Sequence, residues 1–184
     1  TYESIEQVIA DDAVDLIVLA TPNSTHADLA VMALNAGKNV VTDKPMALSV
    51  DEADRMIAAS ESSGAMLSVF MNRRWDGDYL TTRKLIDSGR LGTVRRMEMW
   101  WGKFGMWGGW RGQRAMGGGK LYDLGAHLAD QFCQLNPSPP RRVFAHLQYD
   151  SDQSDVESDA TVTITFEDGA VGVLHTSSVV AAPK

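Results

Sequence analysis

Three side chains able to stabilise or move a proton stand in two short motifs of this sequence. Lys44 lies between an aspartate and a proline, directly after an expected buried strand at Asn39–Thr42. Asp123 and His127 are four residues apart in a glycine-rich run, and this spacing places both on one face of a helix. A lysine, an aspartate and a histidine in one cleft can take the proton of an alcohol that is being oxidised. We therefore predict that Lys44, Asp123 and His127 are catalytic.

Each of these residues also has an ordinary structural explanation. Lys44 would then hold its ammonium in water at a strand end, as most lysines do. Asp123 would be a carboxylate favoured by the dipole at a helix start. His127 would be a core histidine bonded to backbone. The two motifs together favour catalysis.

The first 72 residues alternate strand and helix patterns, and these elements place Lys44. Helices are expected over Thr25–Ala36, ending at Gly37, and from a capping box at Ser49 to about Ser62. The strands are expected at Asp15–Ala20, Asn39–Thr42 and Ala65–Phe70, and the first is apolar enough to be covered on both faces. This order predicts a parallel sheet with right-handed crossovers. Such sheets bind ligands at the carboxyl ends of their strands, where Lys44 stands.

Residues 73–184 follow a different pattern. Helices are expected over Tyr79–Ser88 and Lys120–Leu135, separated by a strand at Thr93–Lys103 and a Gly/Trp-rich loop. Three antiparallel strands are expected at Val143–Tyr149, Ala160–Phe166 and Ala170–Ser177, the last two joined by a turn at 167–169. The predicted fold is thus an α/β domain at 1–72, followed by an α+β domain with a mostly antiparallel sheet at 73–184. Both domains look incomplete, because the sequence begins without methionine and ends on a strand pattern.

Composition narrows the class of protein. The 184 residues carry a net charge of −7 and no basic stripe, which argues against nucleic-acid binding. No apolar stretch is long enough to span a bilayer. Cys133 is the only cysteine, and no signal peptide is recognisable, so we expect a cytoplasmic protein. No G-x-G-x-x-G dinucleotide fingerprint occurs.

Two other kinds of site are rejected. A metal site around Asp123 and His127 lacks further ligands nearby, so we predict no metal. A phosphate-binding P-loop ending at Lys120 fails, because Arg114 stands where a glycine is required and Leu121 where Ser or Thr is required. We expect the three glycines before Lys120 to let the loop pass close to cofactor and substrate.

Four tryptophans gather in the Gly/Trp-rich region, at positions 100, 101, 107 and 110. Aromatic faces stack on the C–H surfaces of sugars, which would suit a carbohydrate. Alternatively Trp101 is core and the others shield the loop. The sequence leaves both interpretations open.

Five segments in chain order resemble one family. They read DLIVLATPNSTH, NAGKNVVTDKP, MNRR, WR followed by GGGKLYDLGAHLAD, and FEDGAVGVLHTS. They are similar to the Gfo/Idh/MocA oxidoreductases, named for glucose–fructose oxidoreductase, inositol dehydrogenase and a rhizopine-catabolism protein. Asp43 replaces the usual glutamate of the family's E-K-P signature. The resemblance covers the middle portion of a member, without the glycine-rich first unit of its Rossmann domain.

This resemblance implies an NAD- or NADP-dependent oxidoreductase that transfers a hydride between nicotinamide and a sugar, polyol or cyclitol hydroxyl. It implies a homo-oligomer, a dimer or tetramer. By the same analogy the substrate contacts Lys44, Trp110, Asp123 and His127. The cofactor-binding residues would be Thr21, Pro22, Asn23, His26, Asp43, Lys44, Pro45, Arg73, Trp110 and Arg111.

Two of these assignments have local alternatives, and so does the function. Asn23 would also suit a helix N-terminal turn, and Arg73 a salt bridge at the domain junction. An NAD-dependent glycosidase or epimerase of the same family would use the cofactor only transiently. A truncated, non-catalytic chain acting as an interaction module is the remaining alternative. The missing glycine turn favours it, because that turn leads the pyrophosphate to a helix N-terminus.

Overall fold

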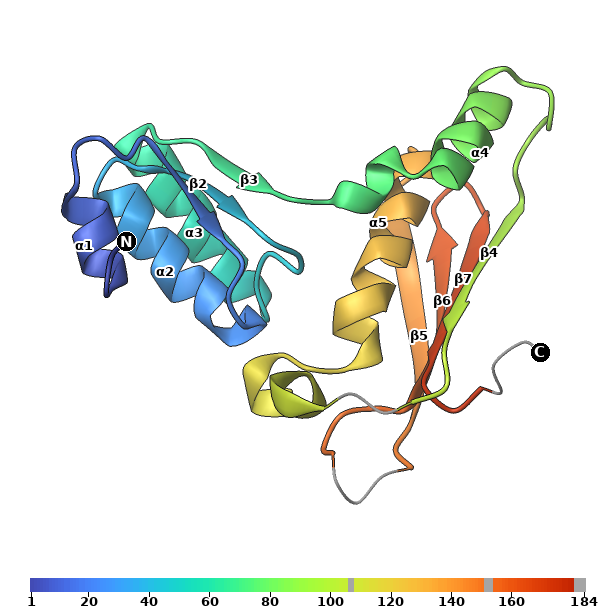
Figure 1. The fold of residues 1–184 in the computed structure, drawn as a ribbon. Coiled ribbons are helices and arrows are strands. Elements are labelled where there is room, and N and C mark those ends of the chain that lie inside the picture. The colour runs from blue at the N-terminus through green and yellow to red at the C-terminus, as the bar shows by residue number, and fades with distance from the viewer. Residues whose placement is uncertain (106–107, 151–153, 181–184) are drawn as a thin grey trace. The chain divides into compact units, whose positions relative to one another are not determined.

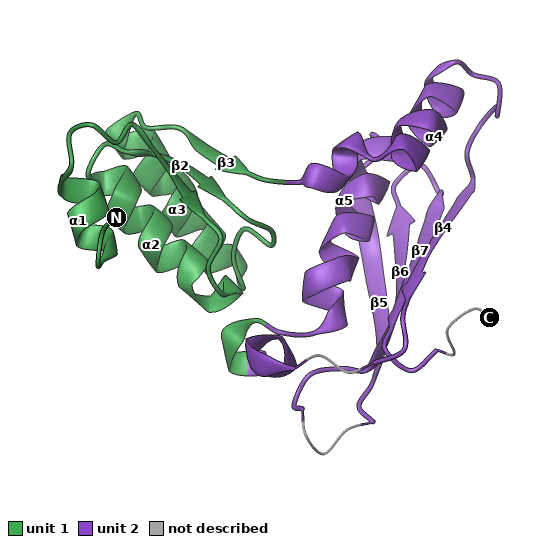
Figure 2. Ribbon diagram, in the orientation of Figure 1, with its two compact units in different colours: residues 1–70, 115–117 green, residues 71–114, 118–184 purple. Residues whose placement is uncertain are grey.

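The computed structural model describes residues 1–105, 108–150 and 154–180, and the chain forms two compact units (Figures 1 and 2). Unit 1 is Thr1–Phe70 with Ala115–Gly117, and unit 2 is Met71–Arg114 with Gly118–Lys184. The glycine run that precedes Lys120 therefore begins in unit 1 and continues in unit 2.

Unit 1 is a three-stranded parallel sheet covered by helices. Its strands β1 (Leu16–Leu19), β2 (Asn39–Thr42) and β3 (Leu67–Val69) pair in the order β1-β2-β3. The helices are α1 (Ile5–Ala10), α2 (His26–Asn35) and α3 (Val50–Ser63), with a 3-10 turn η1 at Asn23–Thr25. The predicted parallel β-α-β-α-β order is confirmed, whereas the short α1 was not expected.

The ends of α3 follow from local chemistry. The Ser49 hydroxyl accepts a hydrogen bond from the Glu52 backbone at 3.1 Å, and the Glu52 carboxylate accepts one from the Leu48 N–H at 2.8 Å. Gly64 closes the helix at φ +71°, a conformation that a Cβ would penalise. The first contact satisfies an N–H group that the first helical turn leaves unpaired, and the second ties the residue before the cap to the helix.

The prediction that the first strand is covered on both faces is wrong. Ile17 and Leu19 are buried in the core with α2 and α3, but Val18 is 65% exposed and Leu16 46% exposed. The reason is that the helices of unit 1 pack on one face of the sheet, so alternate β1 side chains face away from that core.

Unit 2 packs helices on a four-stranded mixed sheet. The strands β4 (Arg96–Gly102), β5 (Pro140–Gln148), β6 (Asp159–Phe166) and β7 (Val171–Ser177) lie in the order β4-β7-β6-β5. Only the β4–β7 pair is parallel, so the mostly antiparallel sheet is confirmed. Helices α4 (Gly77–Asp87) and α5 (Ala126–Leu135) share its core, in which Phe132 and Phe166 are almost fully buried. A 3-10 turn η2 (Asn72–Trp75) precedes α4, and η3 (Gly109–Gly112) and η4 (Arg114–Met116) follow β4.

The expected continuous α-helix over Lys120–Leu135 is wrong in its first turn. Leu121–Gly125, labelled η5, is a π-helix, and regular α-helix begins only at Ala126. Over five residues the apolar pattern of a π turn does not differ from that of an α turn, so periodicity could not separate them. Single π turns are frequent at functional sites. Asp123 thus stands in the wide turn and His127 in the α-helix that follows it.

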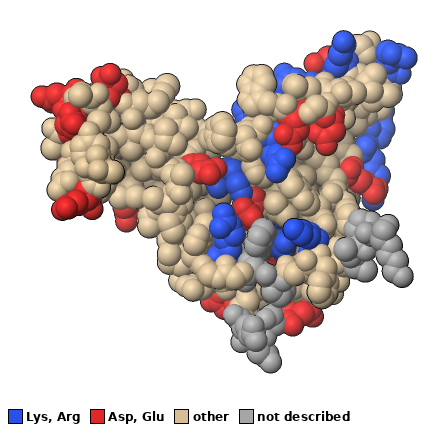
Figure 3. All heavy atoms as spheres, in the orientation of Figure 1, with Lys and Arg blue, Asp and Glu red and all other residues tan. Residues whose placement is uncertain are grey.

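Charge is unevenly distributed along the chain. Figure 3 shows acidic side chains gathered at the end of unit 1, whereas Lys and Arg gather on unit 2. Among residues 1–70 the only Lys and Arg residues are Lys38, Lys44 and Arg55. Lys44 is therefore a rare cation in an acidic unit rather than one member of a basic face.

Candidate functional site

Two loops of unit 1 follow the carboxyl ends of β1 and β2, and His26 joins them. Its Nδ1 lies 2.9 Å from the Pro45 carbonyl oxygen and its Nε2 3.0 Å from the Thr21 carbonyl oxygen. The ring has no exposed surface. Both ring nitrogens thus face backbone carbonyls, and the histidine holds the two loops together. That His26 binds the cofactor stays a prediction.

Lys44 lies just beyond the carboxyl end of β2, as its place in the sequence predicts. The Asp43 N–H donates to the Leu19 carbonyl at 2.8 Å, which extends the pairing of β2 with β1 by one residue. The Lys44 N–H donates to the Asp43 carboxylate at 2.7 Å, and the peptide to Pro45 is cis. Lys44 and Pro45 are half-buried, and Thr21 on the neighbouring loop is exposed.

Asn23 has a structural task in unit 1. Its side chain is 6% exposed, and its Nδ2 donates to the Gly117 carbonyl at 2.7 Å. Asn23 also opens the 3-10 turn η1. The amide therefore fixes the first glycine of the run, and the neighbouring Pro22 is half-buried.

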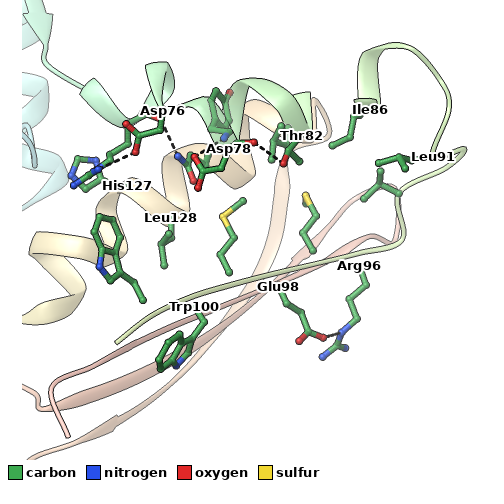
Figure 4. A pocket seen from close by; sticks show the side chains of 18 residues that line it. Asp76, Asp78, Thr82, Ile86, Leu91, Arg96, Glu98, Trp100, His127 and Leu128 are labelled. Atoms are coloured by element: carbon green, nitrogen blue, oxygen red, sulfur yellow. Dashed lines mark hydrogen bonds and ion pairs between the residues drawn. The ribbon is translucent and has the colours of Figure 1, made fainter. Parts of the chain in front are cut away.

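His127 lines a cavity of about 620 Å³ between α4, α5 and β4 of unit 2 (Figure 4). The side chain is 5% exposed, and its ring centroid lies 6.4 Å from that of Trp101, with the planes inclined by 31°. In Figure 4, His127 and Leu128 approach the cavity from α5 and Asp76 from the start of α4. Asp123 is not among the residues that line it.

Arg73 reaches the same cavity. Its guanidinium lies 4.6 Å from the Trp101 ring centroid, and its Nη1 donates to Asp76 at 3.0 Å. The backbone carbonyl of Arg73 accepts a hydrogen bond from Gln131 at 3.1 Å. Arg73 Nε and the Tyr79 hydroxyl are buried and have no hydrogen-bond partner in the part of the chain that the structure describes. This polar lining suits a polar ligand.

Asp123 lies close to a cation of the preceding loop. Arg111 Nε is 4.0 Å from the Asp123 carboxylate, and the Arg111 guanidinium stacks 4.5 Å above the Trp110 ring centroid. The structure thus brings Trp110, Arg111 and Asp123, three of the predicted site residues, together within unit 2. Their contact with cofactor or substrate stays a prediction.

The glycines before Lys120 are crowded by the protein itself. A Cβ on Gly118 would lie 2.3 Å from the Arg111 carbonyl oxygen, and one on Gly119 would lie 2.6 Å from a Glu157 carboxylate oxygen. The expectation that these glycines serve the approach of a ligand therefore has a competing cause in the fold. Sequence reasoning missed Glu157, which is 8% exposed and accepts the Leu121 N–H at 2.6 Å. It lies 36 residues from that helix start, and no local pattern marks the pair.

The structure decides only in part whether the tryptophans of the Gly/Trp-rich region are core residues or stack on a sugar. Trp101 packs against the core of unit 2, as one interpretation expected, and also lines the cavity. Trp100 is 57% exposed and meets His175 edge to face at 6.4 Å. Trp107 lies outside the described residues. Within the described ranges no cluster of three or more His, Cys, Asp or Glu side chains is placed to hold a metal ion.

Comparisons with known proteins define the class. Residues 1–71 match the family model described as "Oxidoreductase family, NAD-binding Rossmann fold", and residues 79–184 match the model of the GFO/IDH/MocA C-terminal domain. The class is an oxidoreductase family whose N-terminal domain has an NAD-binding Rossmann fold. The chain belongs to the Gfo/Idh/MocA family.

Individual relatives agree with this assignment. An uncharacterised oxidoreductase of Schizosaccharomyces pombe is 37% identical over 75% of the chain and 38% of its own length. The scyllo-inositol 2-dehydrogenase (NADP⁺) IolW of Bacillus subtilis is 31% identical over 97% of the chain and 50% of its own length. The chain therefore spans about half the length, or less, of these curated relatives.

Solved structures give the same picture. An NAD-binding protein from Listeria innocua superposes with a TM-score of 0.92 at 33% identity, covering 98% of the chain and 54% of that protein. GenD2 from gentamicin A biosynthesis, solved with NAD, gives a TM-score of 0.92 at 30% identity over 99% of the chain and 53% of its own. No helix among the described residues is long and apolar enough to cross a membrane.

Proposed function

We propose that the protein carrying this chain is an NAD- or NADP-dependent oxidoreductase acting on a hydroxyl of a sugar, polyol or cyclitol. One observation carries the proposal. Lys44 is a rare cation of an NAD-binding unit and stands at the carboxyl end of a parallel strand, the edge at which such sheets bind ligands. The inositol dehydrogenase among the relatives supports the substrate class, as does a 1,5-anhydro-D-fructose reductase of Ensifer adhaerens, 27% identical over 94% of the chain.

The loops of unit 1 fit the nicotinamide end of such a cofactor. Thr21, Pro22, Asp43, Lys44 and Pro45 lie on the two loops that His26 joins, so these loops form one firm edge. From unit 2, Arg73, Trp110 and Arg111 would complete the contacts. When bound, the nicotinamide supplies the acceptor or donor of the hydride.

Within this proposal each catalytic residue has one task. His127 takes the hydroxyl proton, the role for which histidine is suited near neutral pH. The Lys44 ammonium stabilises the negative charge that grows on the same oxygen. Asp123 accepts hydrogen bonds from substrate hydroxyls and keeps the substrate oriented.

The test is reduction of NAD and NADP at 340 nm with a panel of cyclitols, polyols and sugars. We expect Lys44→Ala and His127→Ala to abolish most turnover while the thermal unfolding temperature changes little. His146→Ala is a matched control, because His146 is an exposed histidine on β5. Turnover like that of the natural protein in either site variant would refute these roles. Substrate consumption without net NADH would indicate a glycosidase or epimerase, and no turnover at all a non-catalytic interaction module.

We also propose that the protein is a cytoplasmic homo-oligomer, a dimer or tetramer. Apolar side chains of β5 support association, because Val143 is 66% exposed and Phe144 70% exposed on an edge strand of the sheet. The single cysteine is consistent with a reducing compartment. Light scattering coupled to size exclusion would give the mass. A monomer at micromolar concentration would exclude the oligomer.

A further inference from the structure

Residues 154–157, which precede β6 and are called the brace below, have no task in the proposed chemistry, yet they contact a loop that follows β4. The Ser154 hydroxyl donates to the Gly112 carbonyl at 3.0 Å, and the Asp155 carboxylate accepts the Arg114 N–H at 2.6 Å. The Arg114 guanidinium donates in return to the Asp155 carbonyl at 3.2 Å. Two neighbouring residues of the brace thus hold two neighbouring points of the loop, about 40 residues away in the sequence.

The brace is itself firmly held at its other end. Val156 is 3% exposed and Glu157 8% exposed, and the Glu157 carboxylate accepts the Leu121 N–H at 2.6 Å. The next residue, Ser158, has no exposed surface, and its N–H donates to the Gln148 carbonyl at 2.8 Å. Because half of the brace is buried, it can act as a fixed support for the loop.

The supported loop, residues 109–114, carries two of the predicted cofactor-binding residues. The Gln113 N–H donates to the Trp110 carbonyl at 3.0 Å, and the Arg111 carbonyl accepts the Gly119 N–H at 3.0 Å. The Arg111 guanidinium stacks on the Trp110 ring, but the Arg111 side chain is 46% exposed. Packing therefore constrains this side chain only in part, and the position of the loop backbone decides where the guanidinium lies.

We propose that Asp155 is a positioning residue, whose carboxylate holds the Arg114 backbone and thereby sets Trp110 and Arg111 in place before the cofactor binds. A carboxylate that accepts a backbone N–H makes a charge-assisted hydrogen bond, which is stronger than a neutral one. A loop that is ordered in advance loses less conformational freedom on binding, so its ligand binds more tightly. The inference rests on the proposed function for the effect on the cofactor, but not for the support of the loop. Asp155 touches neither cofactor nor substrate in this scheme.

Two replacements of Asp155 test the hydrogen bond separately from the charge. Asp155→Ala removes the acceptor of the Arg114 N–H, whereas Asp155→Asn removes the charge and keeps an oxygen acceptor. In Asp155→Ala we expect the Kd for NADH or NADPH, measured by calorimetric titration, to rise about tenfold. The value of kcat at saturating cofactor should change less, because the loop holds no group that moves the proton. Asp155→Asn should restore most of the affinity, and the unfolding temperature should change little, because Asp155 is exposed.

Asp87→Ala is the matched control, since Asp87 is an exposed aspartate on α4 whose ion pair with Arg83 also lies in unit 2. We expect its cofactor Kd to match that of the natural protein. An unchanged Kd in Asp155→Ala would overturn the proposal. So would equal losses in Asp155→Ala and Asp155→Asn, or a loss that only follows a lowered unfolding temperature.

Hydrogen exchange followed by mass spectrometry separates this inference from the proposed function, because it needs neither substrate nor cofactor. The Gln113 and Gly119 amides are bonded to carbonyls of the loop rather than to Asp155. In Asp155→Ala the peptides that cover residues 110–120 should exchange faster, and in Asp87→Ala they should not. Unchanged exchange in Asp155→Ala refutes the positioning role even if the enzyme is active. Faster exchange supports the role of Asp155 in the loop even if the natural protein oxidises none of the substrates tested.

Discussion

Glu157 caps the helix that carries Asp123 and His127, and its removal should weaken both the fold and the site. The carboxylate is 8% exposed and accepts the Leu121 N–H at 2.6 Å. Hydrogen bonds to charged groups contribute about 1.5–3 kcal/mol, against about 0.5–1.5 kcal/mol for neutral pairs. The acidic group also lies at a helix start, where the dipole favours negative charge.

These contributions set the size of the effect. Glu157→Gln keeps an oxygen acceptor and loses the charge, so we expect a loss of about 1 kcal/mol in unfolding free energy. Glu157→Ala leaves the Leu121 N–H without its acceptor and opens space beside Gly119, so we expect a loss of about 2–3 kcal/mol. A smaller loss of unfolding free energy for Glu157→Gln than for Glu157→Ala distinguishes a cap from a carboxylate that only fills space.

The assay is urea unfolding at neutral pH, with kcat and KM measured on the same samples below the transition. Glu167→Gln is the control, because Glu167 is an exposed carboxylate in the β6–β7 turn and should change stability by less than about 0.5 kcal/mol. The capping argument fails if the unfolding free energy of Glu157→Ala lies within about 0.5 kcal/mol of that of the natural protein, because ordinary surface substitutions change it by that much. We expect kcat to fall more than KM rises, because the helix start orients the reacting groups.

Three further predictions follow from the packing and the charges. Phe132→Ala should lower the unfolding free energy by about 3–5 kcal/mol, because Phe132 is fully buried in unit 2. Chemical denaturation measures this change. Gly118→Ala should lower the unfolding temperature without any added cofactor, because its Cβ would lie 2.3 Å from the Arg111 carbonyl oxygen; an unchanged temperature would favour the ligand-approach explanation of the glycine. Burial lowers the pKa of Lys120 from its ordinary 10.5, so the unfolded chain holds this proton at pH values where the folded chain has released it. Lys120→Met removes the buried charge and should therefore raise the unfolding free energy. This increase should be largest below the folded pKa of Lys120 and should shrink as pH rises toward 10.5, and an increase that stays constant with pH would contradict the prediction.

The parts of the fold that the sequence predicts well are those decided by neighbouring residues. Asn39–Thr42 is a strand with the expected bounds, because four residues of suitable type stand between the Gly37 helix end and the loop at Lys44 and Pro45. The Ser49 cap and the Gly64 end of α3 are equally local. A hydroxyl three residues from an N–H, or a glycine at a helix end, needs no distant partner to act.

What the sequence does not predict depends on distant partners. Val18 looks buried by its own pattern, and its exposure depends on which face the helices cover. The Arg73 stack on Trp101 joins η2 to β4, and the Glu157 cap joins β6's leading loop to η5. No periodicity within one element carries such information. Family resemblance located Asp123 and His127, but not the residues that hold them.

The glycine run shows why a motif can be recognised before its cause is understood. Gly117 is fixed by the Asn23 amide, Gly118 is pressed against the Arg111 carbonyl, and Gly119 against the Glu157 carboxylate. At Gly117 a Cβ would lie 2.4 Å from a Leu48 side-chain carbon, and at Gly118 and Gly119 it would meet the two groups just named, so all three positions are crowded in the absence of a ligand. The glycines therefore have a structural role at the start of the helix that carries Asp123 and His127, because Gly119 leaves room for the Glu157 carboxylate that accepts the Leu121 N–H.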